Sequence, residues 1–194
     1  MNLRCVISGS AGTGKSTLIK ELKRHKGIWV SEENSKKLST GKYGGEGKRL
    51  WKEFISEKNQ EKRKQARLRF EDAVLEKDIA TFKSAPVKKF NCFFDCGVVE
   101  TYAYLKRDGV KIPKRFSDSI KKYKYDIVFF APIWPRLFKH VAYPAHMVRA
   151  RQFDRILRET YQSMGCKAIT LPKESADERA TFVVRQTQRF TAEK

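Results

Sequence analysis

The sequence predicts an α/β fold in which helices cover a parallel β-sheet, and three observations support this class. Five short apolar segments are rich in β-branched or aromatic residues, as strands buried on both faces are. Segments with helical spacing of apolar residues alternate with them. A glycine-rich loop separates the first apolar segment from the first helical one. The predicted strands are Leu3–Ser8, Ile28–Ser31, Cys92–Asp95, Ile127–Phe130 and Lys167–Thr170.

Two helical patterns lie in the first half of the chain. Apolar residues recur at helical spacing over residues 18–22, and we expect Gly27 to cap the C-terminus of that helix. Residues 61–83 form a second, longer helical pattern in which charged residues surround an apolar stripe. The segment Thr40–Arg49 is rich in glycine and basic residues, which predicts a loop.

Two further helices are expected in the second half of the chain. Residues 146–164 place bulky apolar side chains on one stripe, and Gly165 is positioned to end that helix. Ser175 and Glu178 have the spacing of a capping box and precede another apolar stripe. Helices therefore alternate with the predicted strands, which favours parallel pairing of the strands.

The charge of the chain is strongly positive. It holds 42 lysine and arginine residues against 22 aspartate and glutamate residues, a formal net charge of +20. The basic residues are spread along the chain and do not form a tail. Such a charge favours polyanionic partners, namely nucleic acid, an anionic lipid surface or phosphorylated small molecules. A well-solvated basic surface is the alternative interpretation.

The sequence predicts one domain over residues 1–194, with a basic helical insert near residues 40–85. No segment is apolar over the length that a transmembrane helix needs, and the polar, glycine-rich start is unlike a secretory signal. The four cysteines match no zinc-site spacing, and we expect reduced thiols in a cytoplasmic protein. Cys92 and Cys96 are interpreted as core thiols.

The glycine-rich loop fits the pattern G-x-x-x-x-G-K-[ST] at every fixed position. Glycines let the backbone turn sharply and bring its N–H groups close to phosphate oxygens, and the following helix adds its positive dipole end. We expect Lys15 to reach the β- and γ-phosphates of ATP, and Ser16 to bind Mg²⁺. Thr17 is expected at the α-phosphate. The predicted nucleotide-binding residues of this loop are Gly9, Ser10, Ala11, Gly12, Thr13, Gly14, Lys15, Ser16 and Thr17.

Phosphoryl transfer also needs carboxylates that hold the metal or accept a proton. Asp95 ends the third predicted strand, so its side chain is expected to point into the crevice at the carboxyl ends of the strands. We predict that Asp95 binds the metal or orients the acceptor, and a helix N-cap is its alternative role. Glu32 and Glu33 follow the second strand, and Glu33 is the stronger candidate for the site.

Basic residues cluster after the fourth predicted strand, where we expect a lid near residues 136–151 that closes over the phosphates. Arg136, Arg149 and Arg151 are the candidates for the arginine that covers the transferred group. The other basic residues in this stretch and the following helix are Lys139, Arg155 and Arg158. An outward orientation is the alternative for each of them.

Longer segments of the chain resemble a known family. They are GSAGTGKST, VSEENSKKLS, FFDCGVVETYAYL, KYDIVFFAP, TYQSMG and ITLPKESADERATFV. In this order they resemble the AAA-like P-loop domain that forms the kinase portion of NadR, the nicotinamide riboside kinase. They also look like the TRPL translocation defect proteins, which bind nucleotides. The resemblance covers about residues 3–188 and is weakest in the basic insert.

This resemblance implies a three-layer P-loop NTPase fold with a five-stranded parallel sheet in the kinase-type strand order. It implies that Glu33 and Asp95 face the substrate and the metal, and that Arg179 lies near the nucleotide base. The sequence departs from the family at two points. Cys96 stands where the family usually has an arginine, and residues 140–144 lack the arginine that tends to precede the lid helix.

Together these features predict an ATP- and Mg²⁺-dependent kinase that acts on a nucleoside, a nucleotide or a related metabolite. Asp95 or Glu33 would orient or deprotonate the acceptor hydroxyl. Two alternatives stay open: a nucleotide-dependent switch with a protein or anionic lipid partner, and a polynucleotide-directed enzyme. The guanine-specific pattern Asn/Thr-Lys-x-Asp is missing near the fifth strand, which favours ATP over GTP.

Overall fold

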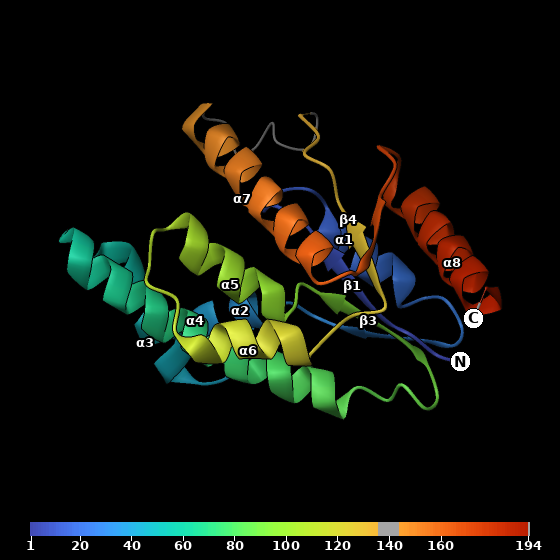
Figure 1. Cartoon of the computed structure of the whole chain (residues 1–194), viewed down its shortest axis with the longest axis horizontal. Coiled ribbons are helices and arrows are strands. Elements are labelled where there is room, and N and C mark those ends of the chain that lie inside the picture. Colours follow the sequence, from blue (N-terminus) through green and yellow to red (C-terminus); the bar gives the residue numbers. More distant parts are fainter. Residues whose placement is uncertain (136–143, 194) are drawn as a thin grey trace.

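A five-stranded parallel sheet forms the centre of the protein, in a computed structural model that describes residues 1–135 and 144–193 (Figure 1). Its strands follow the spatial order β2-β3-β1-β4-β5, and each neighbouring pair runs parallel. The predicted fold class and strand order are thereby confirmed. The strands are β1 (Arg4–Ser8), β2 (Ile28–Ser31), β3 (Asn91–Asp95), β4 (Ile127–Phe130) and β5 (Lys167–Thr170).

The register of the sheet brings the ends of the central strands together. Ile7 of β1 lies opposite Asp95 of β3, and Ser8 lies opposite Phe130 of β4. Because β1 lies between β3 and β4, the loop that leaves Ser8 emerges beside Asp95. Crevices at the carboxyl ends of parallel strands are where α/β folds bind ligands.

Helices cover both faces of the sheet and make three layers (Figure 1). One layer consists of α1 and α8, and the opposite layer is built from α4, α5, α6 and α7. The shorter helices α2 and α3 pack against α4 and extend this second layer beyond the sheet. The helices are α1 (Lys15–Leu22), α2 (Asn34–Ser39), α3 (Gly45–Ser56), α4 (Gln60–Ser84), α5 (Val98–Arg107), α6 (Lys114–Lys122), α7 (Pro144–Ser163) and α8 (Ala176–Ala192).

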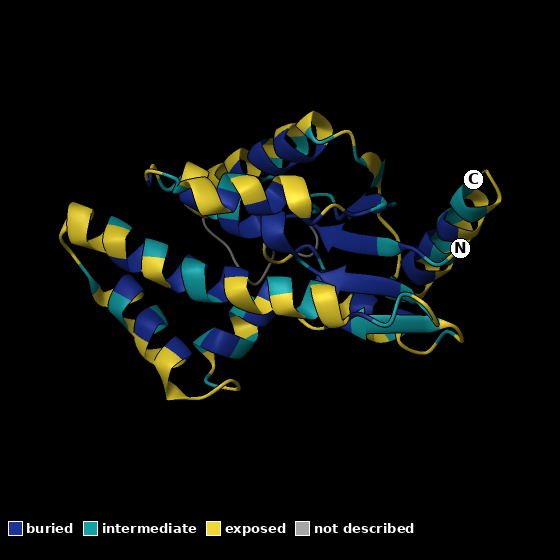
Figure 2. Ribbon diagram, turned by 60° about the horizontal axis from the view of Figure 1, so that its bottom comes forward, coloured by how far each residue is buried: buried dark blue, intermediate teal, exposed yellow. Residues whose placement is uncertain are grey.

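Apolar side chains alternate between the two faces of the inner strands, as the two-residue period of a strand requires. Ile7 of β1 packs with α1 and α8, whereas Val6 packs with the opposite layer. Phe93 and Phe94 of β3 divide between the layers in the same way. All four residues are buried, and Figure 2 shows buried strands in dark blue between the helical layers. The sheet therefore carries two separate cores.

The two edge strands are less buried than expected. Three of the four residues of β5 are exposed, and three of the four residues of β2 are half-buried. The prediction that all five strands are buried on both faces is therefore wrong for β2 and β5. An edge strand has a neighbour on one side only, so solvent reaches side chains that an inner strand would cover.

The prediction of a loop over Thr40–Arg49 is wrong from Gly45 onward, where α3 begins. Gly44 precedes the helix with a φ of +100°, a conformation that suits glycine. Leu50 and Phe54 of α3 are buried, and Leu50 joins an apolar cluster with residues of α2 and α4. Tertiary packing of this apolar face stabilises a helix whose glycine-rich start has low helix propensity.

The ends of two helices test the capping predictions. Gly27 does not cap α1, because that helix ends at Leu22 and Gly27 turns the chain into β2 with a φ of +75°. The capping box of α8 is confirmed: the Ser175 N–H donates to Glu178 Oε2 (3.0 Å), and the Glu178 N–H donates to Ser175 Oγ (3.3 Å). Among the described residues, no helix has both the length and the apolar character that crossing a bilayer requires.

Gly47 provides a test of the contact between α3 and α2. A Cβ atom at Gly47 would lie 2.6 Å from a methyl carbon of Leu38 and 2.9 Å from its carbonyl oxygen. We predict that Gly47→Ala lowers the free energy of unfolding by about 1–3 kcal/mol, the range that overpacking costs, as measured by urea titration. Gly45→Ala is the control, because a Cβ there meets nothing within 4 Å. Equal stability of the two variants would contradict this packing.

Candidate functional site

The glycine-rich loop connects β1 to α1, and three of its glycines, Gly9, Gly12 and Gly14, have positive φ angles that favour glycine. Gly9 has a φ of +132°, and a Cβ there would lie 2.6 Å from the carbonyl oxygen of Ala131. Gly14 has a φ of +81° and is the N-cap of α1, where it provides no side-chain hydrogen bond. The first N–H groups of α1 therefore stay available to an anion, as the phosphate-binding prediction requires.

Hydrogen bonds from three sides hold the loop in shape. Thr13 Oγ1 donates to the carbonyl of Ser10 (2.9 Å), and Ser10 Oγ donates to the carbonyl of Ala150 in α7 (2.7 Å). The buried guanidinium of Arg179, from α8, donates to the carbonyls of Thr13 (3.1 Å) and Gly14 (3.4 Å). The structure thus places Arg179 against the loop backbone, and its expected contact with a nucleotide base stays a prediction.

Lys15 lies inside the curve of the loop. Its Nζ donates to the carbonyls of Gly9 (2.7 Å) and Ser10 (2.8 Å). Burial alone would lower the pKa of Lys15, but neighbouring acidic groups that include Glu33 and Asp95 outweigh it, and the net pKa is raised. Lys15 is therefore held as a cation at the centre of the loop, where phosphate oxygens could replace the two carbonyls as its partners.

Asp95 meets the loop from the end of β3. Ser16 Oγ donates to Asp95 Oδ2 (2.8 Å), while Asp95 Oδ1 is buried and has no hydrogen-bond partner among the described residues. Burial raises the pKa of Asp95 to about 6; the Glu33 carboxylate adds to this rise and the Lys15 ammonium opposes it. Asp95 is thus a carboxylate with one oxygen unused, in direct contact with the predicted metal-binding serine.

Glu33 approaches the same point from the start of α2. Donor atoms of Glu33, Asp95 and Cys96 all lie within 4.8 Å of one another. Asn34 fixes the start of α2, because its Nδ2 donates to Asp78 Oδ1 of α4 (2.8 Å). Cys96 is half-buried with a φ of +64° and lies beside both carboxylates, so its interpretation as a core thiol is wrong. Cys92 is fully buried, as expected.

The oxygen atoms at this point fit a magnesium ion. Mg²⁺ prefers oxygen ligands and is usually held by one or two carboxylates together with a hydroxyl and the phosphates of its nucleotide. Ser16 Oγ, the unused oxygen of Asp95 and the Glu33 carboxylate provide that chemistry. The Cys96 sulfur does not, because burial holds the pKa of this thiol well above its usual range and thiols are poor ligands for Mg²⁺.

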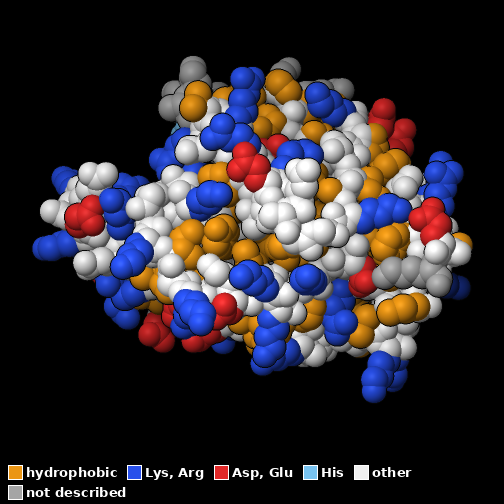
Figure 3. Space-filling view, viewed as in Figure 1, with side chains coloured by type: hydrophobic (Ala, Val, Ile, Leu, Met, Phe, Trp, Pro, Cys, Tyr) orange, Lys and Arg blue, Asp and Glu red, His pale blue; other side chains and the backbone are white. Residues whose placement is uncertain are grey.

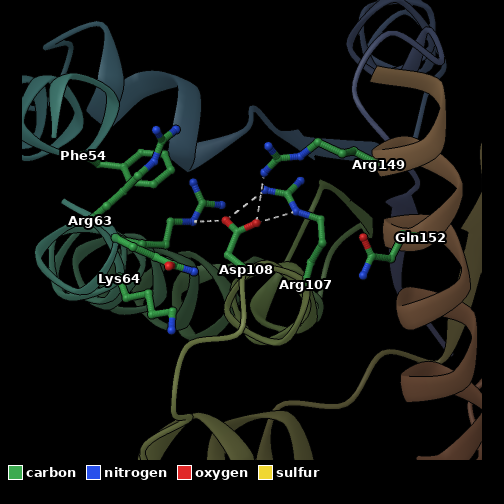
Figure 4. A pocket seen from close by; sticks show the side chains of 9 residues that line it. Phe54, Arg63, Lys64, Arg107, Asp108, Arg149 and Gln152 are labelled. Carbon is green, nitrogen blue, oxygen red and sulfur yellow. Dashed lines mark hydrogen bonds and ion pairs between the residues drawn. The ribbon is translucent and has the colours of Figure 1, made fainter. Parts of the chain in front are cut away.

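Two adjoining cavities extend from the carboxylates toward solvent. The first, which we call the inner cavity, has a volume of about 510 Å³ and is lined by Glu33 and by residues of α2, α3, α4, α5 and α7. The second, the outer cavity, has a volume of about 440 Å³ and includes Asp108 (Figure 4). The residues that line both cavities are Phe54, Arg63, Arg67, Arg107 and Arg149.

The predicted lid arginines have different surroundings. Arg149 of α7 lines both cavities and donates to Asp108 Oδ1 (3.2 Å), whereas Arg151 is exposed. Arg158 packs over Phe130 and donates to Asp154 Oδ2 (2.8 Å), which gives it a structural role. Arg155 is exposed beside Glu159. Arg136, Lys139 and residues 136–143 of the expected lid lie outside the described residues.

Sequence reasoning missed several residues that line the cavities. Arg63, Arg67 and Glu71 of α4, together with Arg107 at the end of α5, were assigned no role. The sequence does contain a signal for two of them. Arg67 and Glu71 are four residues apart, on the face of α4 that also buries Phe70, so a charged pair lies where an apolar stripe is expected.

These features define the class of protein. A phosphate-binding loop of this geometry, between the central strand and the first helix of a parallel sheet, is that of a P-loop nucleotide-binding fold of the kinase type. The chain belongs to the AAA domain family, whose family model matches residues 4–179. No curated protein sequence matches this chain.

Solved structures share the fold at low sequence identity. Deoxyadenosine kinase from M. mycoides, bound to dCMP and dCDP, superposes with a TM-score of 0.63 and 13% identity over 96% of this chain and 100% of that one. The NadR protein in complex with NR superposes with a TM-score of 0.67 and 16% identity over 96% of this chain. The chain spans about half of NadR, 51% of its length. The NadR part of the predicted resemblance is confirmed at the level of the fold. The TRPL translocation defect part stays a prediction.

The raised pKa of Asp95 predicts a pH-dependent effect of its removal. The folded protein keeps the Asp95 proton up to about pH 6, whereas the unfolded chain releases it near pH 3.8. The folded state therefore loses stability, relative to the unfolded state, as the pH rises through this interval. We predict that Asp95→Asn gains about 3 kcal/mol of unfolding free energy relative to the parent between about pH 4 and pH 6.

Urea titrations across this pH range measure the difference between variant and parent. Asp118→Asn, which replaces an exposed carboxylate on α6, is the matched control and should show the same pH dependence as the parent. If the curves of Asp95→Asn and the parent run parallel, Asp95 titrates normally and its environment has been misread.

Proposed function

We propose that this protein is an ATP- and Mg²⁺-dependent kinase that phosphorylates a nucleoside, a nucleotide or a related metabolite. The observation that carries the proposal is the position of Glu33. This carboxylate lies beside Asp95 and the phosphate-binding loop, and it also lines the inner cavity. A nucleotide-dependent switch needs the loop and the metal ligands alone, whereas a kinase also needs a cavity for an acceptor next to the γ-phosphate.

The residues of the site divide the work of the reaction. The loop N–H groups and Lys15 bind and orient the triphosphate, and Ser16 and Asp95 hold the metal. When bound, Mg²⁺ would neutralise charge on the β- and γ-phosphates. Glu33 accepts the proton of the acceptor hydroxyl. The acceptor oxygen forms a bond to the γ-phosphorus, the bond from that phosphorus to the bridging oxygen breaks, and ADP leaves with the electron pair.

Arginines at the mouth of the cavities suit the charge that develops during transfer. A crevice of about 210 Å³ beside the loop is lined by Ser10 and Ala11 together with Arg107 and Arg149. These two arginines therefore lie between the loop and the two cavities that we assign to the acceptor. Arg149 is our candidate for covering the transferred group, and Arg151 and Arg136 remain alternatives.

Replacing Lys15 tests nucleotide binding. We predict that Lys15→Ala weakens ATP binding by about 30-fold or more, because the loss of a charge-assisted contact to phosphate costs about 2 kcal/mol. Isothermal titration with Mg²⁺ present measures the affinity. Lys23→Ala, at an exposed position just after α1, is the control and should bind ATP like the parent. Unchanged affinity in Lys15→Ala would refute our account of the loop.

Replacing Glu33 tests phosphoryl transfer. We first expect a mass-spectrometric screen of nucleosides, nucleotides and vitamins to find a compound that gains the mass of one phosphoryl group only when ATP is present. We then predict that Glu33→Gln lowers kcat for that compound by about 10²–10⁴-fold, as loss of a general base does, with ATP affinity nearly unchanged. Glu46→Gln, on the exposed start of α3, is the control. ATP binding without any phosphorylated product would favour the switch.

A further inference from the structure

The two cavities are far more basic than a neutral acceptor requires. Carboxylates are fewer there than cations, and only Glu33, Glu71 and Asp108 contribute them. The cationic side chains come from α2, α4, α5 and α7 and are Lys36, Arg63, Lys64, Arg67, Arg107 and Arg149. Lysine and arginine are spread over the face of the protein shown in Figure 3, but in these cavities they line two adjoining spaces that open to solvent.

Asp108 contacts three of these arginines but does not neutralise their combined positive charge. Arg107 donates to both of its oxygens (2.8 and 3.0 Å), Arg149 donates to Oδ1 (3.2 Å), and Arg67 Nε lies 3.4 Å from Oδ2 (Figure 4). Burial would raise the pKa of Asp108, but its bonds to Arg107 and the nearby arginine charges outweigh burial and lower it. One carboxylate is thus shared among three guanidinium groups, so positive charge remains for a ligand.

Arg67 and Glu71 leave polar atoms unused in the wall of the cavities. Arg67 is 4% exposed and Glu71 is 1% exposed. Their ion pair spans 2.8 Å. Arg67 Nε lies 3.4 Å from Asp108 Oδ2 but makes no hydrogen bond to it, and neither Arg67 Nε nor Glu71 Oε2 has a hydrogen-bond partner among the described residues. Burial raises the pKa of Glu71 to about 7, although the Arg67 charge opposes the rise. A buried guanidinium donor without a hydrogen bond is costly, and an anion bound in the cavities would satisfy it.

Arg63 lies on the same side of α4 and makes no ion pair with any carboxylate in the described part of the chain. Its guanidinium lies 5.2 Å from the ring centre of Phe54. Phe54, Trp51 and Phe70 form an aromatic wall. The ring centres of Phe54 and Phe70 lie 5.5 and 5.0 Å from that of Trp51. This wall lines the inner cavity together with polar residues of α2, and an aromatic surface of this kind suits a flat or apolar ligand body.

We propose that the acceptor of this kinase is a phosphomonoester, for which a nucleoside 5′-monophosphate is the fitting class, and that Arg63, Arg67, Arg107 and Arg149 bind its phosphate. A phosphate dianion has three terminal oxygens that can accept from several guanidinium groups at once, whereas a neutral nucleoside offers no group of this kind. The aromatic wall would contact the base. This inference rests on the proposed kinase function and specifies the acceptor of that same site. The arginines hold the phosphate of the acceptor, and a hydroxyl of the same molecule, whose proton Glu33 accepts, receives the new phosphoryl group.

Ground-state binding tests the proposal without requiring turnover. The probes are five common nucleosides, their 5′-monophosphates, ribose 5-phosphate and ribose, titrated into the full chain saturated with Mg²⁺ and ADP so that the phosphate-binding loop is occupied. We expect at least one phosphomonoester to bind about tenfold or more tightly than its dephosphorylated parent compound. We expect this gain to shrink as salt is added, because it depends on charge.

Two variants assign the gain to the arginines. Arg63→Gln should remove most of the gain without unfolding the protein, because Arg63 is exposed and makes no ion pair with any residue that the structure describes. Arg149→Gln should also reduce the gain. The matched controls are Lys62→Gln, an exposed neighbour on α4, and Arg155→Gln, an exposed arginine on α7, both of which should keep the full gain.

The outcomes separate this inference from the kinase proposal. It is overturned if no phosphomonoester gains over its parent compound, if Arg63→Gln and Arg149→Gln both keep the gain, or if only RNA or vesicles of anionic lipid bind in an arginine-dependent way. A neutral acceptor that is phosphorylated equally well by the parent and Arg63→Gln overturns it while the kinase stands. Arginine-dependent phosphomonoester binding with no ATP-dependent mass gain supports the binding site and refutes the kinase.

Discussion

Ser16 and Asp95 are 79 residues apart in the chain, and the hydrogen bond between them sets the geometry of the whole carboxyl edge. It fixes the start of α1 against the end of β3, and the parallel pairing of β1 with β3 makes this contact possible. The position of Lys15 follows from it, because this residue precedes Ser16 in the first turn of the helix. Glu33 then meets Asp95 from α2, so the phosphate-binding loop, the two carboxylates and the inner cavity share one corner of the sheet.

The same corner holds several charged side chains in the protein interior, and burying charged groups lowers the stability of the folded state. Buried ionised groups are tolerated when they are paired and fully hydrogen-bonded, and here some are not. Asp95, Arg67 and Glu71 each have a buried polar atom that makes no hydrogen bond within the described ranges 1–135 and 144–193. Sites that bind ligands often retain such local strain because the ligand relieves it, whereas a purely structural core would select apolar side chains of the same volume.

The local sequence predicted most of the elements whose formation does not depend on tertiary packing. The five strands and the phosphate-binding loop follow from short patterns whose physics is local, and their bounds differ by at most one residue from those observed. The helix α3 was missed because its glycine-rich start lacks helix propensity and its stability comes from contacts with α2 and α4. The burial of β2 and β5 was overestimated because the sequence of a four-residue strand does not indicate whether the strand lies at the edge or in the middle of the sheet.

Of the candidate site, the sequence predicted the residues that follow strands and missed those that face one another from different helices. Asp95 and Glu33 were found because each lies at or shortly after the end of a strand, and the carboxyl ends of parallel strands lie at the same edge of the sheet. Arg67 and Arg107 were missed because a basic residue on a helix looks the same in sequence whether it faces solvent or a cavity. In this chain the overall excess of positive charge concealed them further.

The hydrogen bond from Ser10 Oγ to the carbonyl of Ala150 connects α7 directly to the phosphate-binding loop. Near its other end the helix is fastened by Tyr161, whose ring packs on Phe130 and whose hydroxyl donates to Glu100. A tilt about that fixed end displaces the start of α7 the most, and there it carries Arg149 as well as Ala150. Any displacement of this turn of α7 therefore strains the hydrogen bond to Ser10, which couples the position of Arg149 to that of the phosphate-binding loop.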